Sequence, residues 1–232
     1  MREPGGPTSC PLGARFVGEA LYFGTEAGPV LRYHREAESL GTPLEGHAGA
    51  VCSLARAPGG TEIASASLDG TLRLWDASTG RLRRTLGRAG TPLRDVAYAQ
   101  DGEALVTGDA LGGVSIVRRR DGSEERRARP HGAAITRVRF SRDGRVVMSS
   151  SLDRSVRLET RDGSRLVRTT PTHGATRALL SFDGQFLYYL DGPDLVRLAA
   201  EPSVRTDDPQ VMLRSAEERA GVRLGDEGLE PR

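Results

Sequence analysis

Apolar and polar residues alternate along short segments of this chain, and turns rich in glycine and aspartate separate the segments. In the clearest segment, Leu72 and Leu74 alternate with Thr71, Arg73 and Trp75, the period of two that is typical of a β-strand. Neighbouring segments with turn residues between them predict three more strands, at residues 51–55, 62–67 and 82–86. Four short strands in succession indicate a small antiparallel sheet.

This unit recurs at regular intervals along the chain. The turn glycines show it, since the first four are evenly spaced and the last follows at almost the same interval: Gly18, Gly60, Gly102, Gly144 and Gly184. Three histidines keep the same register: His47, His131 and His173. A repeat of roughly 40–45 residues is typical of a propeller, in which each repeat forms one four-stranded blade. We therefore expect an all-β fold, a β-propeller of about five four-stranded blades.

The period also predicts how the chain is divided. We expect the propeller to occupy residues 4–206, with repeats at about 4–45, 46–87, 88–129, 130–171 and 172–206. A tail, 207–232, follows the array. Within it Asp208 can cap a helix, Pro209 suits the first helical position and Gly221 can end it, so we expect a short helix over 209–220.

The best preserved repeat, 46–87, resembles the WD-repeat family of β-propellers. It contains the hallmarks of that family: Gly46-His47, Ser65, Asp69-Gly70 and Trp75-Asp76. The resemblance implies a buried chain of hydrogen bonds through Asp69, His47, Ser65 and Trp75. These groups suit each other, because the indole N–H only donates, a hydroxyl donates and accepts, and an imidazole can bridge a hydroxyl to a carboxylate. A hydrolase triad is the other interpretation of Ser, His and Asp, but no Gly-x-Ser-x-Gly surrounds Ser65.

Other repeats keep only part of this network. The fourth retains His131, Ser149 and Asp153 but has Glu159 at the Trp position, and we expect that carboxylate to reach solvent or an arginine. The fifth retains His173. In the third repeat the Ser, Asp and Trp positions hold other residues, so we expect that blade to depend on packing alone: Thr107, Leu111 and Val117.

Rings of this family commonly have seven blades, which leaves two alternatives for a five-repeat chain. Either the ring closes at five blades, or the array is an incomplete seven-bladed ring. An open array leaves strand edges and a blade face unpaired and would favour self-association.

The resemblance also implies a partner-binding face on one side of the ring. In the family, the exposed positions follow the His by three and five residues and precede the Asp by one. Carried over by register, the candidate contact residues are Thr8, Cys10, Glu26, Ala50, Cys52, Leu68, Pro92, Arg94, Ala110, Ala134, Thr136, Leu152 and Thr176. This small, largely apolar set favours docking of a protein or peptide over catalysis.

We therefore expect a non-catalytic scaffold for protein–protein interaction. A bacterial signalling protein is one setting in which such a scaffold would act. The alternative is a propeller enzyme of hydrolase or lactonase type with a site in the central channel. That site would require converging carboxylates or histidines, and no such cluster can be identified in the sequence. We predict no catalytic residue, no cofactor and no bound metal.

Composition narrows the partners and the source. All 33 basic residues are arginine, and the chain has no lysine and no asparagine, which indicates a GC-rich, bacterial genome. Schiff-base and phosphate-loop chemistry that needs lysine is excluded. The net charge is only +2, and two arginine runs, 118–120 and 126–127, are expected to form a solvated face, so we do not expect a nucleic-acid partner.

The N-terminal segment and the two cysteines bear on the compartment of the protein. Residues 1–12 lack the apolar core of a secretory signal, and no apolar stretch is long enough for a membrane span, so we expect a cytoplasmic protein without a membrane partner. Cys10 and Cys52 are separated by one full repeat, which places them at one register position of adjacent repeats. We expect two buried, reduced thiols, since the sequence shows no partners for a disulfide or a metal site.

Overall fold

The structure is a computed structural model. It describes residues 10, 12–86, 90–171, 178–181, 186–191 and 194–199, together with the backbone of two strands at 222–225 and 228–231. Every regular secondary-structure element in these ranges is a β-strand.

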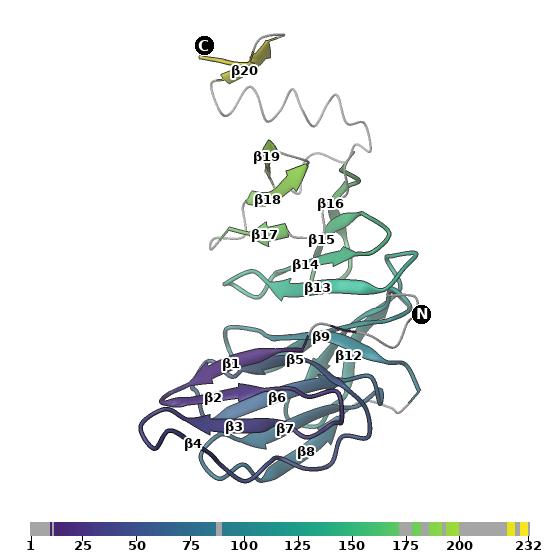
Figure 1. Cartoon of the computed structure of the whole chain (residues 1–232). Helices are drawn as coiled ribbons and strands as arrows, with labels where there is room; N and C mark the ends of the chain where they lie inside the picture. The colour runs from purple at the N-terminus through teal and green to yellow at the C-terminus, as the bar shows by residue number, and fades with distance from the viewer. Residues whose placement is uncertain are drawn as a thin grey trace, which may run out of the picture.

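Five antiparallel sheets follow one another along the chain, and each forms one blade (Figure 1). Blade 1 contains β1 (Ala14–Val17), β2 (Ala20–Phe23), β3 (Leu31–His34) and β4 (Ser39–Leu40). Blade 2 contains β5 (Val51–Arg56), β6 (Glu62–Ser67), β7 (Leu72–Asp76) and β8 (Leu82–Leu86). Blade 3 contains β9 (Leu93–Tyr98), β10 (Ala104–Asp109), β11 (Val114–Arg118) and β12 (Glu124–Ala128). Blade 4 contains β13 (Ile135–Phe140), β14 (Val146–Ser151), β15 (Val156–Thr160) and β16 (Arg165–Thr169).

Blade 5 is described by three strands, β17 (Ala178–Leu180), β18 (Phe186–Asp191) and β19 (Asp194–Ala199). A separate hairpin, β20 (Val222–Gly225) with β21 (Gly228–Pro231), lies beyond it in the sequence. The all-β, blade-based propeller expected from the repeat is thus confirmed. The helix expected over 209–220 lies outside the described residues.

The repeat register is visible in the backbone. Gly18, Gly60, Gly102 and Gly144 all have positive φ, between 57° and 74°, a conformation that glycine adopts without the strain a side chain would bring. Each stands in the tight turn between the first two strands of its blade. The periodic glycines therefore mark one repeated turn, as the sequence predicts.

The hydrophobic core is divided into layers between successive blades. The first strands of the blades pack side by side in chain order, β1 against β5, β5 against β9 and β9 against β13. Successive side chains of a strand point to opposite faces of the sheet, so each strand contributes to the layers on both sides of its blade. In β7, Leu72 and Leu74 pack in the layer between blades 2 and 3, whereas Trp75 packs with Tyr22 in the layer between blades 1 and 2.

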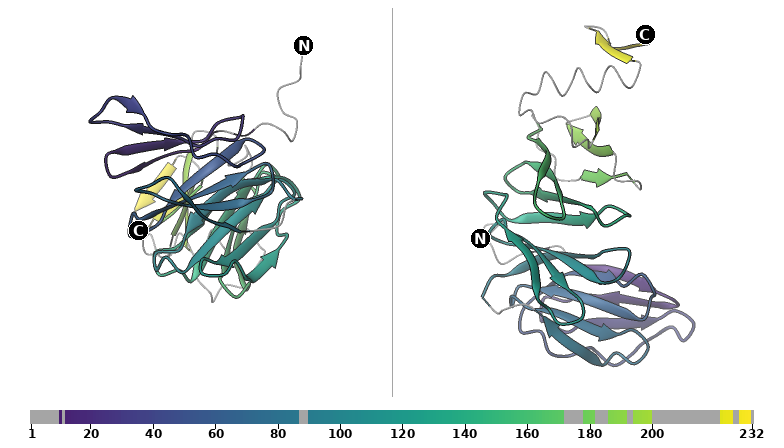
Figure 2. Two further views of the ribbon diagram at one scale, coloured as in Figure 1. Left: turned by 90° about the horizontal axis from the view of Figure 1, so that it is seen from below. Right: turned by 180° about the vertical axis from the view of Figure 1, so that it is seen from behind.

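The described blades form an open array. Blades 1 to 3 lie together at one end and blade 5 at the other in both side views, and blade 1 lies at the edge of its group in the view from below (Figures 1 and 2). Blade 1 buries Tyr22 and Val17 against blade 2, and its other face carries side chains that are exposed or half-exposed: Phe16, Leu21, Phe23, Leu31, Tyr33 and Leu40. This set is here called the blade 1 outer face.

Candidate interaction site of the propeller

The predicted network of blade 2 is present in the structure. The Nδ1 of His47 lies 2.9 Å from Oδ2 of Asp69, and its Nε2 lies 2.7 Å from Oγ of Ser65. The Nε1–H of Trp75 donates to the same serine oxygen at 2.8 Å. With the proton of His47 on Nδ1, the imidazole donates to Asp69 and accepts from Ser65, so every polar atom of the buried chain has a partner.

Burial and hydrogen bonding shift the titration of this network. Burial lowers the pKa of His47, and the adjacent Arg73 lowers it further, against the opposing effect of Asp69. Burial alone would raise the pKa of Asp69, but hydrogen bonds from Thr71, His47 and Ala48 outweigh it and lower the pKa to about 2. At neutral pH the pair is therefore a neutral imidazole and a carboxylate, which suits a structural role.

Blade 4 repeats the network without its indole. His131 Nε2 lies 2.8 Å from Oγ of Ser149, and Nδ1 lies 3.1 Å from Oδ2 of Asp153. Glu159, at the Trp position, forms an ion pair with Arg126 of blade 3. The expectation that Glu159 would meet an arginine is confirmed. His173 of the fifth repeat lies outside the described residues.

Blade 3 does not depend on packing alone, so that expectation is wrong. Asp95 on β9 accepts hydrogen bonds from Ser53 Oγ of blade 2 at 2.6 Å and from the Val138 amide of blade 4 at 2.8 Å. Arg139 adds a 2.8 Å contact to the same carboxylate. One buried carboxylate therefore joins three blades. Asp95 follows Ser53 by one full repeat, so register could have pointed to their meeting.

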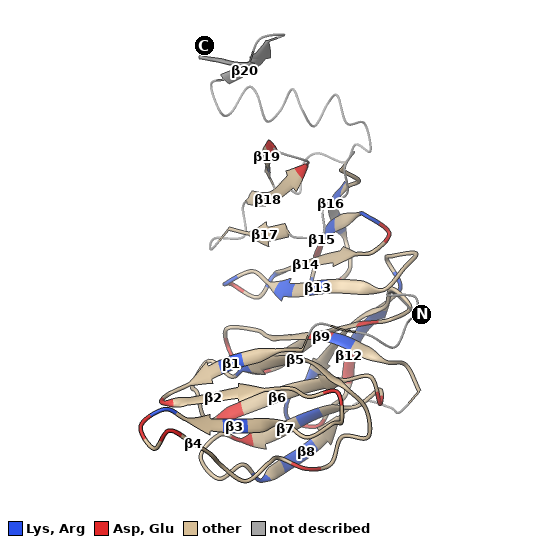
Figure 3. Ribbon diagram, viewed as in Figure 1, with Lys and Arg blue, Asp and Glu red and all other residues tan. Residues whose placement is uncertain are grey.

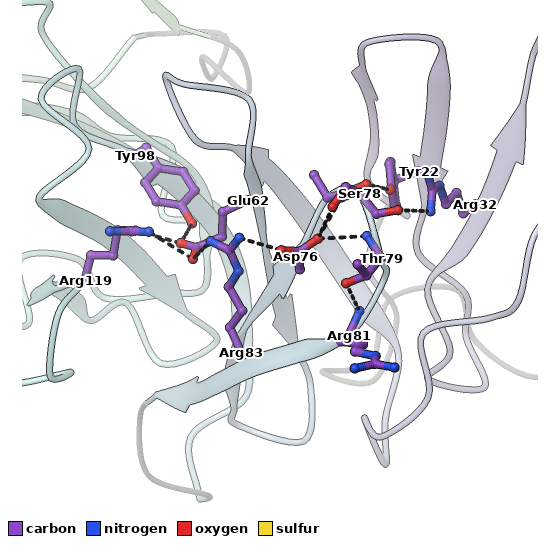
Figure 4. A network of polar contacts seen from close by, with 11 residues as sticks. Tyr22, Arg32, Glu62, Asp76, Ser78, Thr79, Arg81, Arg83, Tyr98 and Arg119 are labelled. Carbon is purple, nitrogen blue, oxygen red and sulfur yellow. Dashed lines mark hydrogen bonds and ion pairs between the residues drawn. The ribbon is translucent and has the colours of Figure 1, made fainter.

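A second polar cluster joins blades 2 and 3 at Glu62 (Figure 4). Its carboxylate accepts from Tyr98 Oη at 2.8 Å and from Arg119 Nε at 2.8 Å, both in blade 3. Arg83 of blade 2 lies 3.4 Å from Oε2 and also pairs with Asp76. These hydrogen bonds keep the pKa of Glu62 low although burial would raise it. Sequence reasoning missed this cluster, because its partners are 36 and 57 residues away from Glu62.

The arginine runs were expected to form a solvated face, and this is only partly correct. Arg118, Arg120 and Arg127 are exposed, but Arg119 and Arg126 bind Glu62 and Glu159 across blade boundaries. Basic and acidic segments are interspersed over the described blades (Figure 3). Two of the five arginines in the runs therefore join blades, and the other three are solvated.

The candidate contact residues occupy equivalent places in blades 2, 3 and 4. The Leu68 amide donates to the Ala50 carbonyl at 2.9 Å. The same 2.9 Å backbone bond joins Ala110 to Pro92 and Leu152 to Ala134. Each blade thus presents a pair of contact positions, one from the loop before its first strand and one from the turn after its second. Leu152 is 56% exposed and Glu26 is exposed, whereas the other described members are half-buried or buried.

The two cysteines of the contact set form a disulfide, so the expectation of reduced thiols is wrong. Cys10 and Cys52 have a Cα–Cα distance of 5.4 Å, and Cys52 is 4% exposed. The physical reason is the register itself, since equal positions of adjacent repeats meet where first strands pack side by side. Cys52 is consequently closed to a partner. Thr8 and Thr176 lie outside the described residues.

No helix among the described residues has the length and apolar character of a membrane span. Within the same ranges, no three His, Cys, Asp or Glu residues lie close enough together to hold a metal ion.

Comparisons with known proteins identify the repeat. Residues 37–76 and 122–158 match the model of the WD domain, G-beta repeat. Coronin-7 of Homo sapiens is 34% identical over 122 residues, which cover 50% of this chain and 13% of that protein. WD repeat-containing protein SL1-17 of Schistosoma mansoni is 28% identical over 47% of this chain and 36% of its own length. Eukaryotic translation initiation factor 3 subunit I of Neurospora crassa is 41% identical over 69 residues, 30% of this chain and 19% of that protein.

The chain thus spans well under two thirds of the length of these relatives. All three are eukaryotic, so they give no support to the expected bacterial source. The two matched segments fall on blades 1 to 2 and blades 3 to 4 of the five-sheet array. The chain is therefore a blade-based β-propeller in which two segments are similar to the WD repeat.

Proposed function

We propose that this chain is a non-catalytic interaction module that binds a protein or peptide partner on one ring face. The proposed face consists of the paired contact positions of blades 2 to 4, with Arg94 and Thr136 on the adjacent first strands. Residues 4–206 would act together as the propeller that presents it. A loop surface on a rigid scaffold is the usual location of a binding site.

The observation that carries this proposal is the equivalence of the three pairs. The same backbone bond holds Ala50 with Leu68, Pro92 with Ala110 and Ala134 with Leu152, so side chains at these positions vary on a fixed frame. Leu152 is an exposed apolar residue on that frame, so a partner that covers it would bury apolar area. His47 and His131, in contrast, are bound within their blades, which favours a scaffold over an enzyme.

The setting of the module is part of the proposal. The relatives include a protein named as a subunit of a translation initiation factor, which fits a protein that works within an assembly. A role in bacterial signalling has no support from the eukaryotic relatives. The disulfide argues against the cytoplasmic expectation, because disulfides are rare in reducing compartments.

Site-specific photo-crosslinking in the source cell tests the contact face. A benzophenone side chain at Leu152 or Ala110 should crosslink to one discrete protein, whereas the same group at Gly59, in a turn at the other end of blade 2, should not. The identified partner is then titrated against the purified chain, and Leu152→Asp should weaken binding at least tenfold. Equal crosslinking from Gly59, or unchanged affinity of Leu152→Asp, would contradict the proposed face.

A further inference from the structure

A cavity of about 550 Å³ lies between blades 2 and 3, within the usual size range of ligand sites. Leu72 and Leu86 line it from blade 2, and Thr107, Asp109, Ser115 and Val117 line it from blade 3. None of the proposed contact-face residues lines this cavity. It lies on the face of blade 3 that corresponds, by the repeat register, to the face on which blades 2 and 4 carry their buried hydrogen-bond networks.

The cavity exists because blade 3 lacks the large side chains of that network. By the repeat register, Val117 stands at the position of Trp75 and Glu159. Ser115 stands at the position of Arg73 and Arg157. In blade 2 the Arg73 guanidinium lies against Gly46 and next to His47. Arg157 of blade 4 is likewise buried and close enough to His131 to act on its charge, so blades 2 and 4 each place their own guanidinium on this face, and blade 3 places a serine there.

A carboxylate faces the vacated space. Asp109 replaces the serines that stand at the same register in blades 2 and 4, and it is only 9% exposed. Its Oδ1 accepts from the amides of Leu111 at 2.8 Å and Gly113 at 2.7 Å. Its Oδ2 has no hydrogen-bond or ion-pair partner among the described residues. The one basic residue of the described lining, Arg127, lies 3.8 Å from Glu124.

We propose that this cavity binds a guanidinium group, the side chain of an arginine presented by a protein partner. A guanidinium would pair with Asp109 through charge-assisted hydrogen bonds and could donate to the hydroxyls of Thr107 and Ser115. It would occupy the space that the chain fills with its own arginine in blades 2 and 4. The described lining carries three acidic side chains, Asp109, Asp121 and Glu124, against the one basic side chain of Arg127, so the cavity favours a cationic occupant.

Calorimetric titration of the full chain tests the proposal with three probes. N-acetyl-arginine amide should bind saturably, and the neutral, nearly isosteric N-acetyl-citrulline amide should bind at least tenfold more weakly. Agmatine, a small guanidinium compound without a peptide backbone, shows whether the guanidinium comes from a protein or from a small molecule. Weaker binding than the arginine amide supports a protein partner, and tighter binding would overturn it in favour of a small molecule. Equal binding of the arginine and citrulline probes would overturn the proposal.

Variants locate the binding. Asp109→Asn retains the Oδ1 acceptor that holds the turn, so it should fold and bind at least tenfold more weakly. Ser115→Arg should abolish binding and raise Tm, because the chain then supplies the guanidinium itself. Asp143→Asn, the same change in an exposed turn of blade 4, should bind normally. Unchanged affinity in Asp109→Asn and Ser115→Arg would overturn the assignment.

Two more variants distinguish an arginine of a partner from one of this chain, and this cavity from the contact face. Arg88 lies in the sequence between Leu86 and Gly90, which both line the cavity, and is outside the described residues. Binding that appears only in Arg88→Ala would overturn the proposal, since the chain would then provide the occupant. Leu152→Asp on the contact face should leave arginine amide binding unchanged, so failure of either proposal can be recognised independently.

Discussion

Single serines decide how well the buried networks are satisfied. Ser65 serves two neighbours in blade 2, His47 and Trp75, whereas Ser149 serves only His131 in blade 4, where Glu159 replaces the indole. A buried polar group that loses its partner costs about 1–3 kcal/mol. Removing the hydroxyl of Ser149 leaves one buried group without its partner, whereas removing that of Ser65 leaves two, so the two blades can be compared directly.

We expect Ser65→Ala to lower the free energy of unfolding by about 3 kcal/mol, because it leaves both the indole N–H and the imidazole nitrogen unpaired. Ser149→Ala should cost about half as much. Urea denaturation measures both, with Ser39→Ala on the exposed strand β4 as control, expected within about 0.5 kcal/mol of the parent. Equal losses at the two buried serines would contradict the shared role of Ser65.

The pH dependence of stability should report the same histidines. Burial lowers the pKa of His47 and His131 in the folded chain, so below their ordinary pKa of about 6.5 the unfolded chain binds more protons. Stability is then fully present above that pH and is lost as the pH falls. Asp69 and Asp153, with pKa values lowered to about 2, add a second loss only between about pH 4 and 2.

We expect the free energy of unfolding to fall between pH 7.5 and 5.5, and to fall less steeply in His47→Gln. Urea titrations at a series of pH values measure this. The substitution itself lowers stability, so the slope, and not the absolute value, is the readout. A flat profile over this range in the parent chain would show that the imidazoles do not titrate as their burial requires.

At the scale of elements, polar clusters and one covalent bond join the blades in addition to apolar packing. Glu62 is nearly inaccessible and its main partners, Tyr98 and Arg119, are in the next blade. Removing one member of such a buried pair leaves an uncompensated charge and costs more than the pair contributes. The cluster should therefore control the junction between blades 2 and 3.

We expect Glu62→Gln to destabilise the chain by about 2 kcal/mol, because Arg119 loses its counterion, and Arg83 keeps only Asp76, while the side-chain shape is kept. Glu36→Gln, at an exposed position of blade 1, is the control. Hydrogen exchange should show faster opening in β9 and β11 than in blade 1. Uniform acceleration over all blades, or none, would contradict a local role at this junction.

The Cys10–Cys52 disulfide joins the segment before blade 1 to β5 of blade 2. Its sequence separation of 42 residues closes a loop whose entropy in the unfolded chain is worth about 4 kcal/mol at most. Reduction with dithiothreitol should lower Tm, and Cys10→Ser should have the low Tm with or without the reductant. Two free thiols in the untreated, denatured chain would contradict the bond.

At the scale of the molecule, the sequence predicts the features that depend on local pattern and on the repeat period, namely the strands and their turns. Strand β6 and strand β8 have the predicted bounds, because alternation and glycine turns act within a few residues. Asp95, Glu62 and the disulfide were missed, because each depends on which positions of different blades meet. For Asp95 and Cys52 that information was present as the repeat register; for Glu62 it was not, since Tyr98 and Arg119 occupy other register positions.

The open array exposes faces that an interior blade would bury. On blade 1, Phe16 is 63% and Leu40 is 61% exposed. On blade 5, Leu179 and Leu195 are 60% and 69% exposed. Internal blades bury the corresponding faces against a neighbour, and contiguous exposed apolar patches of this kind favour association. A contact between unlike ends of two copies would be heterologous, so it can extend beyond a dimer.

We expect the purified chain to self-associate at micromolar concentration through the blade 1 outer face. The double variant Phe16→Glu, Leu40→Glu should shift the mass measured by sedimentation velocity towards that of a monomer, because charges then oppose burial of the face. Leu82→Glu is the matched control, since Leu82 is a 44% exposed leucine on the outermost strand of blade 2 and should leave the association unchanged. A monomeric parent chain at high concentration would show that the blade 1 outer face is tolerated in solvent, and equal dissociation by Leu82→Glu would show that general charge, and not this face, controls the assembly.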